Sequence, residues 1–388
     1  MSESSPQVAT PPSLNWIQRL VIWSVLTVVR SIYKVKVVNP ERVPASGGVL
    51  ILPNHVSYVD ALIIGVASPR FVRFVIWDEL YHIKFLTGFL RLVGTVPISA
   101  TRAKDGVRSV ATALKEGGMV ALFPEGQITR LGTVNELKKG FEIMARQGGA
   151  RVVPMYLDGL FGSVTSFHGG FFFKKRPKRL RCPVHVYFGE PMDAKAATAV
   201  AVREALVNLS AEAFLLRPIW QSVGEDRVAF ANALRLCDVN WHVVGDQFLC
   251  LEPAGSPIYR TVHELARLLP GTKIVADHVE AGGAPLVVFC GSETLSGLTG
   301  TERLAFCWQG VNDPLVPLSD HVYRGCMDAS TGILVSTELP DPPAAGGEDP
   351  QNGRKVGALG RMLPCMRPDS VPAGLRVDEA GFVEPNAA

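Results

Sequence analysis

The chain has 388 residues, a length that favours two domains over one. Apolar residues make up 47% and charged residues 19%, which excludes a disordered chain and indicates a globular protein with a sizeable core. The formal net charge of +3 is too small to indicate a partner by itself. The seven cysteines include no C-x-x-C pair, which favours reduced thiols in a cytosol-facing protein over disulfides or a zinc site.

The N-terminal region consists of a polar tail, residues 1–13, which we expect to be disordered, and an apolar segment, residues 14–36. Basic residues interrupt this segment, and its uncharged run Leu20–Val29 is too short for a membrane span, which needs about 20 residues. The pattern favours an amphipathic helix that lies in a membrane interface, with Trp16 and Trp23 as membrane-binding side chains. A core helix of a soluble domain is the alternative.

Residues 37–220 alternate between apolar runs of strand length and helical patterns. The runs are Gly48–Leu52, Val72–Ile76, Met119–Phe123, Arg151–Leu157 and Val184–Phe188, and the helical patterns cover 57–67, 104–116 and 134–147. This alternation predicts an α/β domain whose mostly parallel sheet is flanked by helices. Residues 225–388 are richer in proline, glycine and cysteine, and we expect a smaller, less regular α/β domain there.

The segment Pro53–Asp60 follows one strand-like run and opens a helical pattern. An imidazole, with an ordinary pKa of about 6.5, can take a proton from a hydroxyl at neutral pH. A carboxylate that accepts its other ring N–H fixes the tautomer and stabilises the imidazolium. His55 and Asp60 are therefore candidate catalytic residues, and Ser57 is the predicted helix N-cap. The alternative is a structural histidine beside a helix-surface aspartate, because this spacing is common by chance.

A second polar segment follows the run Met119–Phe123, at the carboxyl end of a predicted strand, where open α/β sheets place their sites. Glu125 is a candidate for orienting a polar head group, and Gly126 allows close backbone approach. Arg130 is a candidate phosphate ligand. The eight histidines are scattered along the chain, so no metal site is predicted.

These motifs resemble those of the glycerolipid acyltransferase family, which includes the 1-acylglycerol-3-phosphate acyltransferases. Their order, spacing and placement match over about residues 38–190. The matching blocks are Asn54-His55-x-x-x-x-Asp60, Phe123-Pro-Glu-Gly126 and Val153-Pro154-Met155.

The resemblance implies an O-acyltransferase of phospholipid biosynthesis. Such an enzyme moves a fatty acyl group from an acyl thioester, carried by coenzyme A or acyl carrier protein, to a lysophospholipid or lysophosphatidate hydroxyl, with no other cofactor. It implies that His55 is the general base and that Asp60 orients it. The implied substrate-binding residues are Asn54, Glu125, Gly126, Arg130 and Pro154.

One block departs from the family pattern. Where the family carries an arginine after Gly-x-x-x-Ile, this chain has Ala100, and Arg102 becomes the candidate phosphate ligand. This departure and the segment Phe123–Arg130 resemble members that act on larger head groups, such as 2-acylglycerophosphoethanolamine acyltransferases. The acceptor head group and the donor carrier therefore stay open.

The segment Phe171–Arg181 sets three aromatic residues beside six cations. Cations attract an anionic leaflet and phenylalanines enter the acyl boundary, which favours peripheral or monotopic attachment to the cytoplasmic face of a membrane. A nucleic-acid patch and a solvated hairpin loop are the alternatives, and we expect no nucleic-acid partner. The candidate membrane-binding residues here are Phe171, Phe172, Lys174, Lys175 and Arg176.

In the C-terminal region, Gly332–Pro343 and Lys355–Pro364 faintly resemble adenylate-forming acyl-activating domains. Gly291–Gly300 is similar to a phosphate loop, but no lysine follows it. We therefore expect a degenerate, non-catalytic remnant of such a domain. Two alternatives to a simple acyltransferase stay open: a bifunctional enzyme that also activates fatty acids, and a catalytically inactive membrane-bound scaffold.

Overall fold

The computed structural model describes residues 15–78, 81, 87–88, 90–91, 93–98, 103–176, 181–223, 226–239, 247–269, 271–282, 285–299, 302–310, 313, 316, 321–342 and 350–386. The predicted N-terminal tail lies outside these residues. The chain divides into two compact units. The first comprises 1–128, 137–165 and 175–209, and the second comprises 129–136, 166–174 and 210–388.

The first unit contains an eight-stranded sheet. Its order is β1 (Tyr33–Val38), β7 (Cys182–Phe188), β6 (Arg151–Asp158), β2 (Val49–Pro53), β5 (Met119–Ala121), β3 (Val72–Trp77) and β4 (Val96–Ile98), with β8 (Met192–Asp193) against β6. Every pairing is parallel except those of β6 with β7 and β8. The predicted mostly parallel α/β sheet is thus confirmed.

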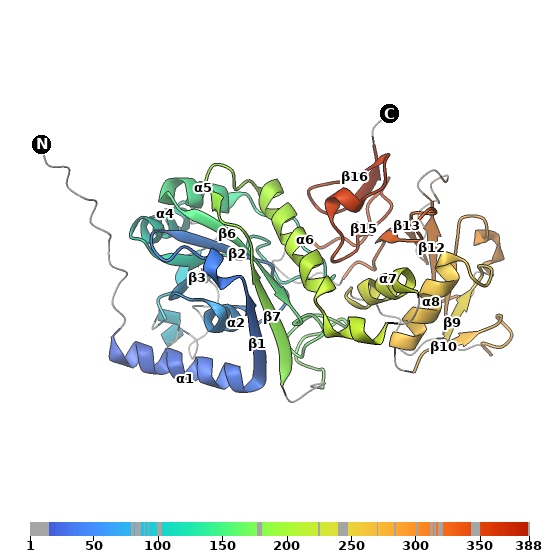
Figure 1. Cartoon of the computed structure of the whole chain (residues 1–388), viewed down its shortest axis with the longest axis horizontal. Helices are drawn as coiled ribbons and strands as arrows, with labels where there is room; N and C mark the ends of the chain where they lie inside the picture. The colour runs from blue at the N-terminus through green and yellow to red at the C-terminus, as the bar shows by residue number, and fades with distance from the viewer. Residues whose placement is uncertain are drawn as a thin grey trace, which may run out of the picture. The chain divides into compact units, whose positions relative to one another are not determined.

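Helices lie on both faces of this sheet, with α1 and α2 along one side and α4 and α5 along the other (Figure 1). Their bounds are α1 (Trp16–Ile32), α2 (Asp60–Ala67), α4 (Ala103–Lys115), α5 (Gly140–Gly148) and α6 (Ala199–Leu215), with a short 3₁₀ helix at Pro40–Arg42. In β2, Val49 and Ile51 pack against Ile63 of α2, while Leu50 points to the opposite face, and all are fully buried. Each such side chain contributes about 1.5–3 kcal/mol.

Helix α5 begins later than the sequence predicts, at Gly140 rather than near residue 134. The backbone N–H of Lys138 donates to the carbonyl of Pro124 at 2.8 Å, a long-range bond that replaces a helical one. The predicted end is correct: Gly149 adopts the left-handed conformation at φ 61° and caps the helix.

Helix α2 begins at Asp60, so the prediction that Ser57 is its N-cap is wrong. The N-cap residue is Val59, whose N–H donates to the hydroxyl of Ser57 at 3.2 Å. Ser57 instead belongs to the loop between β2 and α2, because its own N–H is bound by the Asp60 carboxylate.

The second unit contains a seven-stranded sheet, so this region is also α/β and more regular than predicted. Its order is β10 (Lys273–Val275), β9 (Gln247–Cys250), β11 (Leu286–Cys290), β12 (Leu304–Gln309), β13 (Val322–Met327), β14 (Leu334–Thr337) and β15 (Arg361–Met362). Strands β9 to β13 pair in parallel, and β14 and β15 are antiparallel. Also present are α7 (Arg227–Cys237), α8 (Pro257–Leu268), the hairpin β16 (Leu375–Val377) and β17 (Val383–Pro385), and 3₁₀ helices at Pro218–Ser222, Leu295–Gly297 and Pro368–Ser370.

A buried ion pair crosses the end of the second sheet. The side chain of Glu338 has no exposure and accepts from the Nε and the backbone N–H of Arg324, each at 2.9 Å. Arg354 approaches the same carboxylate at 3.4 Å. The buried charge of Arg324 is thus paired with that of Glu338, as buried charges must be.

All seven cysteines are free thiols. Burial raises the pKa of Cys250 to about 11 and that of Cys326 to about 12. Both thiols therefore stay protonated at neutral pH, and neither is an activated nucleophile.

Candidate active site

The two chemical motifs of the sequence meet because their strands are neighbours. Strands β2 and β5 pair in parallel, with Ile51 opposite Ala121, and the N–H of Leu122 donates to the carbonyl of Ile51 at 3.1 Å. Their carboxyl ends therefore lie at the same edge of the sheet. His55 follows β2 and Glu125 follows β5, which places both residues at this edge.

His55 and Asp60 are in direct contact, as the sequence predicts. The ring Nδ1 of His55 lies 2.8 Å from Oδ2 of Asp60, whose side chain is completely buried. The same oxygen accepts the backbone N–H groups of Val56 at 2.7 Å and of Ser57 at 2.9 Å. With Nδ1 donating to the carboxylate, Nε2 is left as the proton acceptor of the ring.

Phe123 holds the other face of the histidine. Its ring is stacked on the imidazole of His55 with centroids 3.8 Å apart and an interplanar angle of 18°. The imidazole keeps 18% of its surface exposed, so one edge stays accessible. No role was predicted for Phe123 from the sequence, although its position soon after β5 placed it near the end of the neighbouring strand.

Glu125 contacts the backbone of the histidine. Its Oε1 accepts the N–H of His55 at 2.7 Å, and the side chain is buried. The turn after it closes through the N–H of Gly126, which donates to the carbonyl of Phe123 at 3.1 Å. Gly126 has a φ of 73°, a left-handed conformation that favours glycine. The Glu-Gly turn thus fixes the position of His55 from the neighbouring strand.

Asn54 and Pro154 connect β2 to β6. The side chain of Asn54 donates to the carbonyl of Leu157 at 3.3 Å and accepts the N–H of Leu157 at 2.7 Å. Pro154 lies in β6 opposite Leu52, is buried, and accepts the N–H of Gly189 at 2.8 Å. These contacts hold the strand ends from which the histidine loop begins.

No contact that the structure describes brings the predicted phosphate ligands, Arg130 and Arg102, to the His55–Asp60 pair. Arg130 is grouped with the second unit, where its guanidinium lies 5.0 Å from the ring centroid of Phe167 and its N–H donates to Gln351 at 2.7 Å. Arg102 lies outside the described residues. Binding of a phosphate by either arginine stays a prediction.

The predicted membrane-binding residues are largely exposed. On α1, Trp16 is 72% and Trp23 is 63% exposed, and the helix starts with a capping box between Asn15 and Gln18. Within the described ranges, no helix is long and apolar enough to cross a membrane.

The aromatic and basic segment near residue 171 presents some of its side chains to solvent. Phe171, Lys174 and Arg176 are exposed, whereas Lys175 is half-buried. Phe172 is also half-buried, with its ring 5.1 Å from that of another phenylalanine of the same unit. In the part of the chain that the structure describes, no cluster of histidine, cysteine and carboxylate side chains could hold a metal ion.

The part of the chain that carries this site is similar to known proteins. Residues 34–158 match the family model described as Acyltransferase. A 1-acyl-sn-glycerol-3-phosphate acyltransferase of Bacillus subtilis is 34% identical over 129 residues, which are 32% of this chain and 63% of that protein. The crystal structure of the 1-acyl-sn-glycerophosphate (LPA) acyltransferase PlsC from Thermotoga maritima is similar with a TM-score of 0.40 and 23% identity, covering 52% of this chain and 82% of that one.

The family match covers both residues of the histidine–aspartate pair and both residues of the Glu-Gly turn. This part of the chain is similar to the glycerolipid acyltransferase family. The chain spans 63% of the length of its Bacillus subtilis relative.

A long-chain-fatty-acid–CoA ligase from Archaeoglobus fulgidus is similar with a TM-score of 0.26 and 12% identity, covering 99% of this chain and 79% of that one. The acyl-activating remnant in the second unit stays a prediction.

Proposed function

We propose that this protein is an O-acyltransferase that moves a fatty acyl group from an acyl thioester to the free hydroxyl of a monoacyl glycerophospholipid. The acceptor is 1-acylglycerol-3-phosphate or a related lysophospholipid, and the donor is carried by coenzyme A or acyl carrier protein. The observation that carries the proposal is the 2.8 Å contact between the His55 ring and the buried Asp60 carboxylate. The family of residues 34–158 supports the same class of reaction.

The reaction needs one base and no covalent intermediate on the protein. Nε2 of His55 takes the proton of the acceptor hydroxyl as its oxygen attacks the thioester carbonyl carbon. The new ester C–O bond forms, the C–S bond breaks, and the thiolate leaves with the proton that the imidazolium returns. Asp60 stabilises the transient imidazolium through Nδ1–H.

The surrounding side chains make this base rigid before substrate arrives. Stacking on Phe123 fixes the plane of the ring, and the Glu125 carboxylate fixes the backbone that bears it. We therefore assign Glu125 and Asn54 a positioning role, because their side chains bond to the protein backbone. Gly126 and Pro154 stay candidates for lining the acceptor site. Such preorganisation lowers the reorganisation cost of the transition state.

Attachment to the cytoplasmic face of a membrane fits a lipid acceptor. We propose that α1 lies in the interface, because it exposes several large apolar side chains at helical spacing: Trp16, Ile17, Leu20 and Trp23. Liposome co-sedimentation of a Trp16→Ala, Trp23→Ala double variant should show reduced binding. A Val279→Ala variant, which shortens an exposed apolar residue of the second unit, should bind as the wild type does. Equal binding of all three proteins would refute the role of α1.

The proposed activity is tested with purified protein and a panel of monoacyl glycerophospholipids, each with an acyl-CoA and an acyl-carrier-protein donor. A His55→Ala variant should lose acyl transfer and keep its fold. His263→Ala, which removes a histidine of α8 whose ring centroid lies 4.1 Å from that of Tyr259, is the matched control and should retain activity. A folded His55→Ala variant with substantial activity would contradict the mechanism, and an inactive wild type across the panel would contradict the function.

A further inference from the structure

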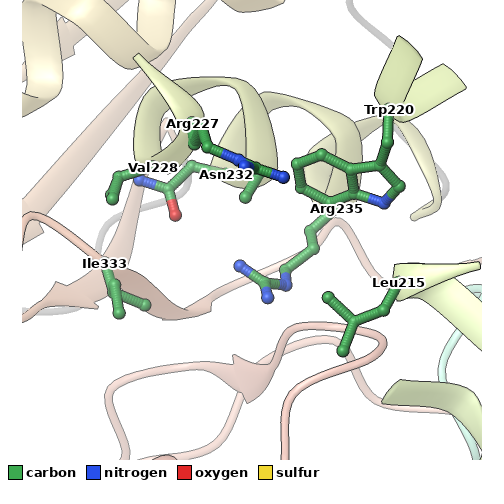
Figure 2. A pocket seen from close by; sticks show the side chains of 8 residues that line it. Leu215, Trp220, Arg227, Val228, Asn232, Arg235 and Ile333 are labelled. Atoms are coloured by element: carbon green, nitrogen blue, oxygen red, sulfur yellow. The ribbon is translucent and has the colours of Figure 1, made fainter. Parts of the chain in front are cut away.

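A pocket of about 260 Å³ lies within the second unit, and none of the candidate active-site residues lines it. It is bounded by the end of α6, the 3₁₀ helix at Pro218–Ser222, one face of α7 and the residue before β14 (Figure 2). Its lining combines two arginines with apolar side chains. Neither the histidine–aspartate motif nor any family block accounts for it.

The two arginines lie on one face of α7. Arg227 and Arg235 are eight residues apart, which is about two helical turns and about 12 Å along the axis. Over the described ranges of the chain, neither forms an ion pair with a carboxylate. Each guanidinium instead faces an aromatic ring: Arg235 lies 4.7 Å from the centroid of Phe214, and Arg227 lies 6.0 Å from that of Trp220. The pocket is therefore strongly cationic.

Arg235 is the deeper of the two cations. Its Nε is buried and has no hydrogen-bond partner among the residues that the structure describes. Figure 2 shows its guanidinium extending from α7 between Leu215 and Ile333. Asp238 acts on it electrostatically, but this carboxylate is already bonded to Arg217 at 2.5 Å. Burial lowers the pKa of Arg235, which is the signature of a cation that lacks sufficient compensation.

The rest of the pocket is mostly apolar, and its one amide side chain is held by hydrogen bonds. Leu215, Val228 and Ile333 contribute aliphatic surface, and Leu215 remains 63% exposed. Asn232 also lines the pocket, but its amide is fully used: it donates to Thr261 and to the carbonyl of Gly332 at 2.8 Å, and it accepts the N–H of Leu334. These bonds tie α7 to the start of β14, so a ligand would find the pocket already formed.

We propose that this pocket binds the head group and first methylenes of a single-chain anionic amphiphile, which carries either a carboxylate or a phosphate. A guanidinium fork matches both anions in a bidentate geometry. The volume lies just below the usual range for small-molecule pockets, about 300–1,000 Å³, so it suits a head group and part of a chain rather than a whole phospholipid. The exposed Leu215 lets the remainder of the chain lie along the surface.

Titration calorimetry on the full chain tests this proposal with four ligands of equal chain length, each below its micelle-forming concentration: decanoate, decyl phosphate, decanol and decyltrimethylammonium. We expect the anions to bind at least about tenfold more tightly than decanol and the cation not to bind. Tighter binding of decanoate identifies a fatty acid as the source, and tighter binding of decyl phosphate a monoacyl phosphate. Decanol binding as tightly as both anions would overturn the proposal.

An Arg235→Met variant locates the binding. It keeps an apolar stem against Phe214 and removes the charge, so affinity for the anions should fall by about tenfold or more. The matched control is Arg376→Met, which alters an exposed arginine of β16 paired with Glu384 and should bind as the wild type does. Unchanged anion affinity in Arg235→Met would overturn the assignment.

If circular dichroism shows that Arg235→Met is unfolded, the test is made with Arg227→Met, because Arg227 is the more exposed of the two arginines. It should weaken anion binding severalfold, and unchanged binding would again overturn the assignment. Acyl transfer is measured on the same variants, so that failure of this proposal can be told apart from failure of the proposed activity. A site separate from the reaction can lose its ligand while acyl transfer continues.

Discussion

Replacing Asp60 with asparagine is the sharpest test of the histidine–aspartate pair. The substitution keeps the size and shape of the side chain and removes its charge. In the native protein Oδ2 accepts three donors: the His55 ring and the N–H groups of Val56 and Ser57. An amide oxygen has two lone pairs and no net charge, so it cannot serve all three donors equally well.

The expected cost follows from these three bonds. A hydrogen bond to a charged group is worth about 1.5–3 kcal/mol, and one between neutral groups about 0.5–1.5 kcal/mol. Replacing the charged acceptor by a neutral one therefore costs about 1 kcal/mol for each bond. Asp60→Asn should therefore lower the free energy of unfolding by about 3 kcal/mol. The new NH₂ would lie where Oδ1 is, an atom for which the described part of the chain provides no hydrogen-bond partner, and this adds to the cost.

The effect on catalysis should be larger than the effect on binding. Asp60 is completely buried, and in the proposed mechanism it stabilises the imidazolium, so its loss should lower kcat by about 10²–10⁴-fold and leave KM nearly unchanged. Acyl-transfer kinetics and urea denaturation measure the two effects. Asp193→Asn is the control: this exposed aspartate pairs with Arg151, and its substitution should change stability by less than about 1 kcal/mol. A folded Asp60→Asn variant with kcat within about tenfold of the wild type would refute the proposed role.

Three further changes have defined outcomes. Gly126→Ala should destabilise the protein by about 1–2 kcal/mol and lower kcat/KM, because φ is 73° in the turn that positions the histidine. Glu338→Gln should lower the free energy of unfolding in urea by about 3–5 kcal/mol, because it leaves Arg324 buried without its counter-charge. Burial raises the pKa of Glu302, but hydrogen bonds, led by those from Thr299, outweigh it and lower the pKa to about 2. A depressed carboxyl pKa stabilises the fold above its ordinary value of 4.5, and this contribution is lost as the pH falls toward 2. The stability difference between wild type and Glu302→Gln should therefore shrink over that range.

Matched variants make these outcomes specific. Gly140→Ala, where no atom lies within 4 Å of an added Cβ, should be neutral or stabilising by up to about 1 kcal/mol. Glu190→Gln removes an exposed partner of Arg42 and should cost less than about 1 kcal/mol. Equal effects of Gly126→Ala and Gly140→Ala, or of Glu338→Gln and Glu190→Gln, would contradict these predictions. A stability difference between wild type and Glu302→Gln that does not change with pH would also contradict them.

Part of the candidate site could be predicted from the sequence because it is local. His55 and Asp60 are five residues apart, and a strand followed by a helix returns their side chains to one side. Their contact depends only on the conformation of the short loop between β2 and α2. The bond from the His55 N–H to Glu125 and the stacking on Phe123 are different, because they depend on β2 and β5 being neighbours. No local pattern gives the order of strands in a sheet, although the carboxyl-end rule correctly places both motifs at one edge.

The sequence by itself determined the strand runs, the glycine end of α5 and the residue types of the histidine–aspartate pair, because these depend on side-chain shape and on interactions within a few residues. The tertiary structure decided the start of α5, where Lys138 bonds to Pro124, and the assignment of Arg130 to the second unit. It also brought Arg227 and Arg235 into one pocket with Leu215 and Ile333. Such features arise when buried donors, charges and apolar faces find partners far along the chain, and only the packed fold specifies which partners those are.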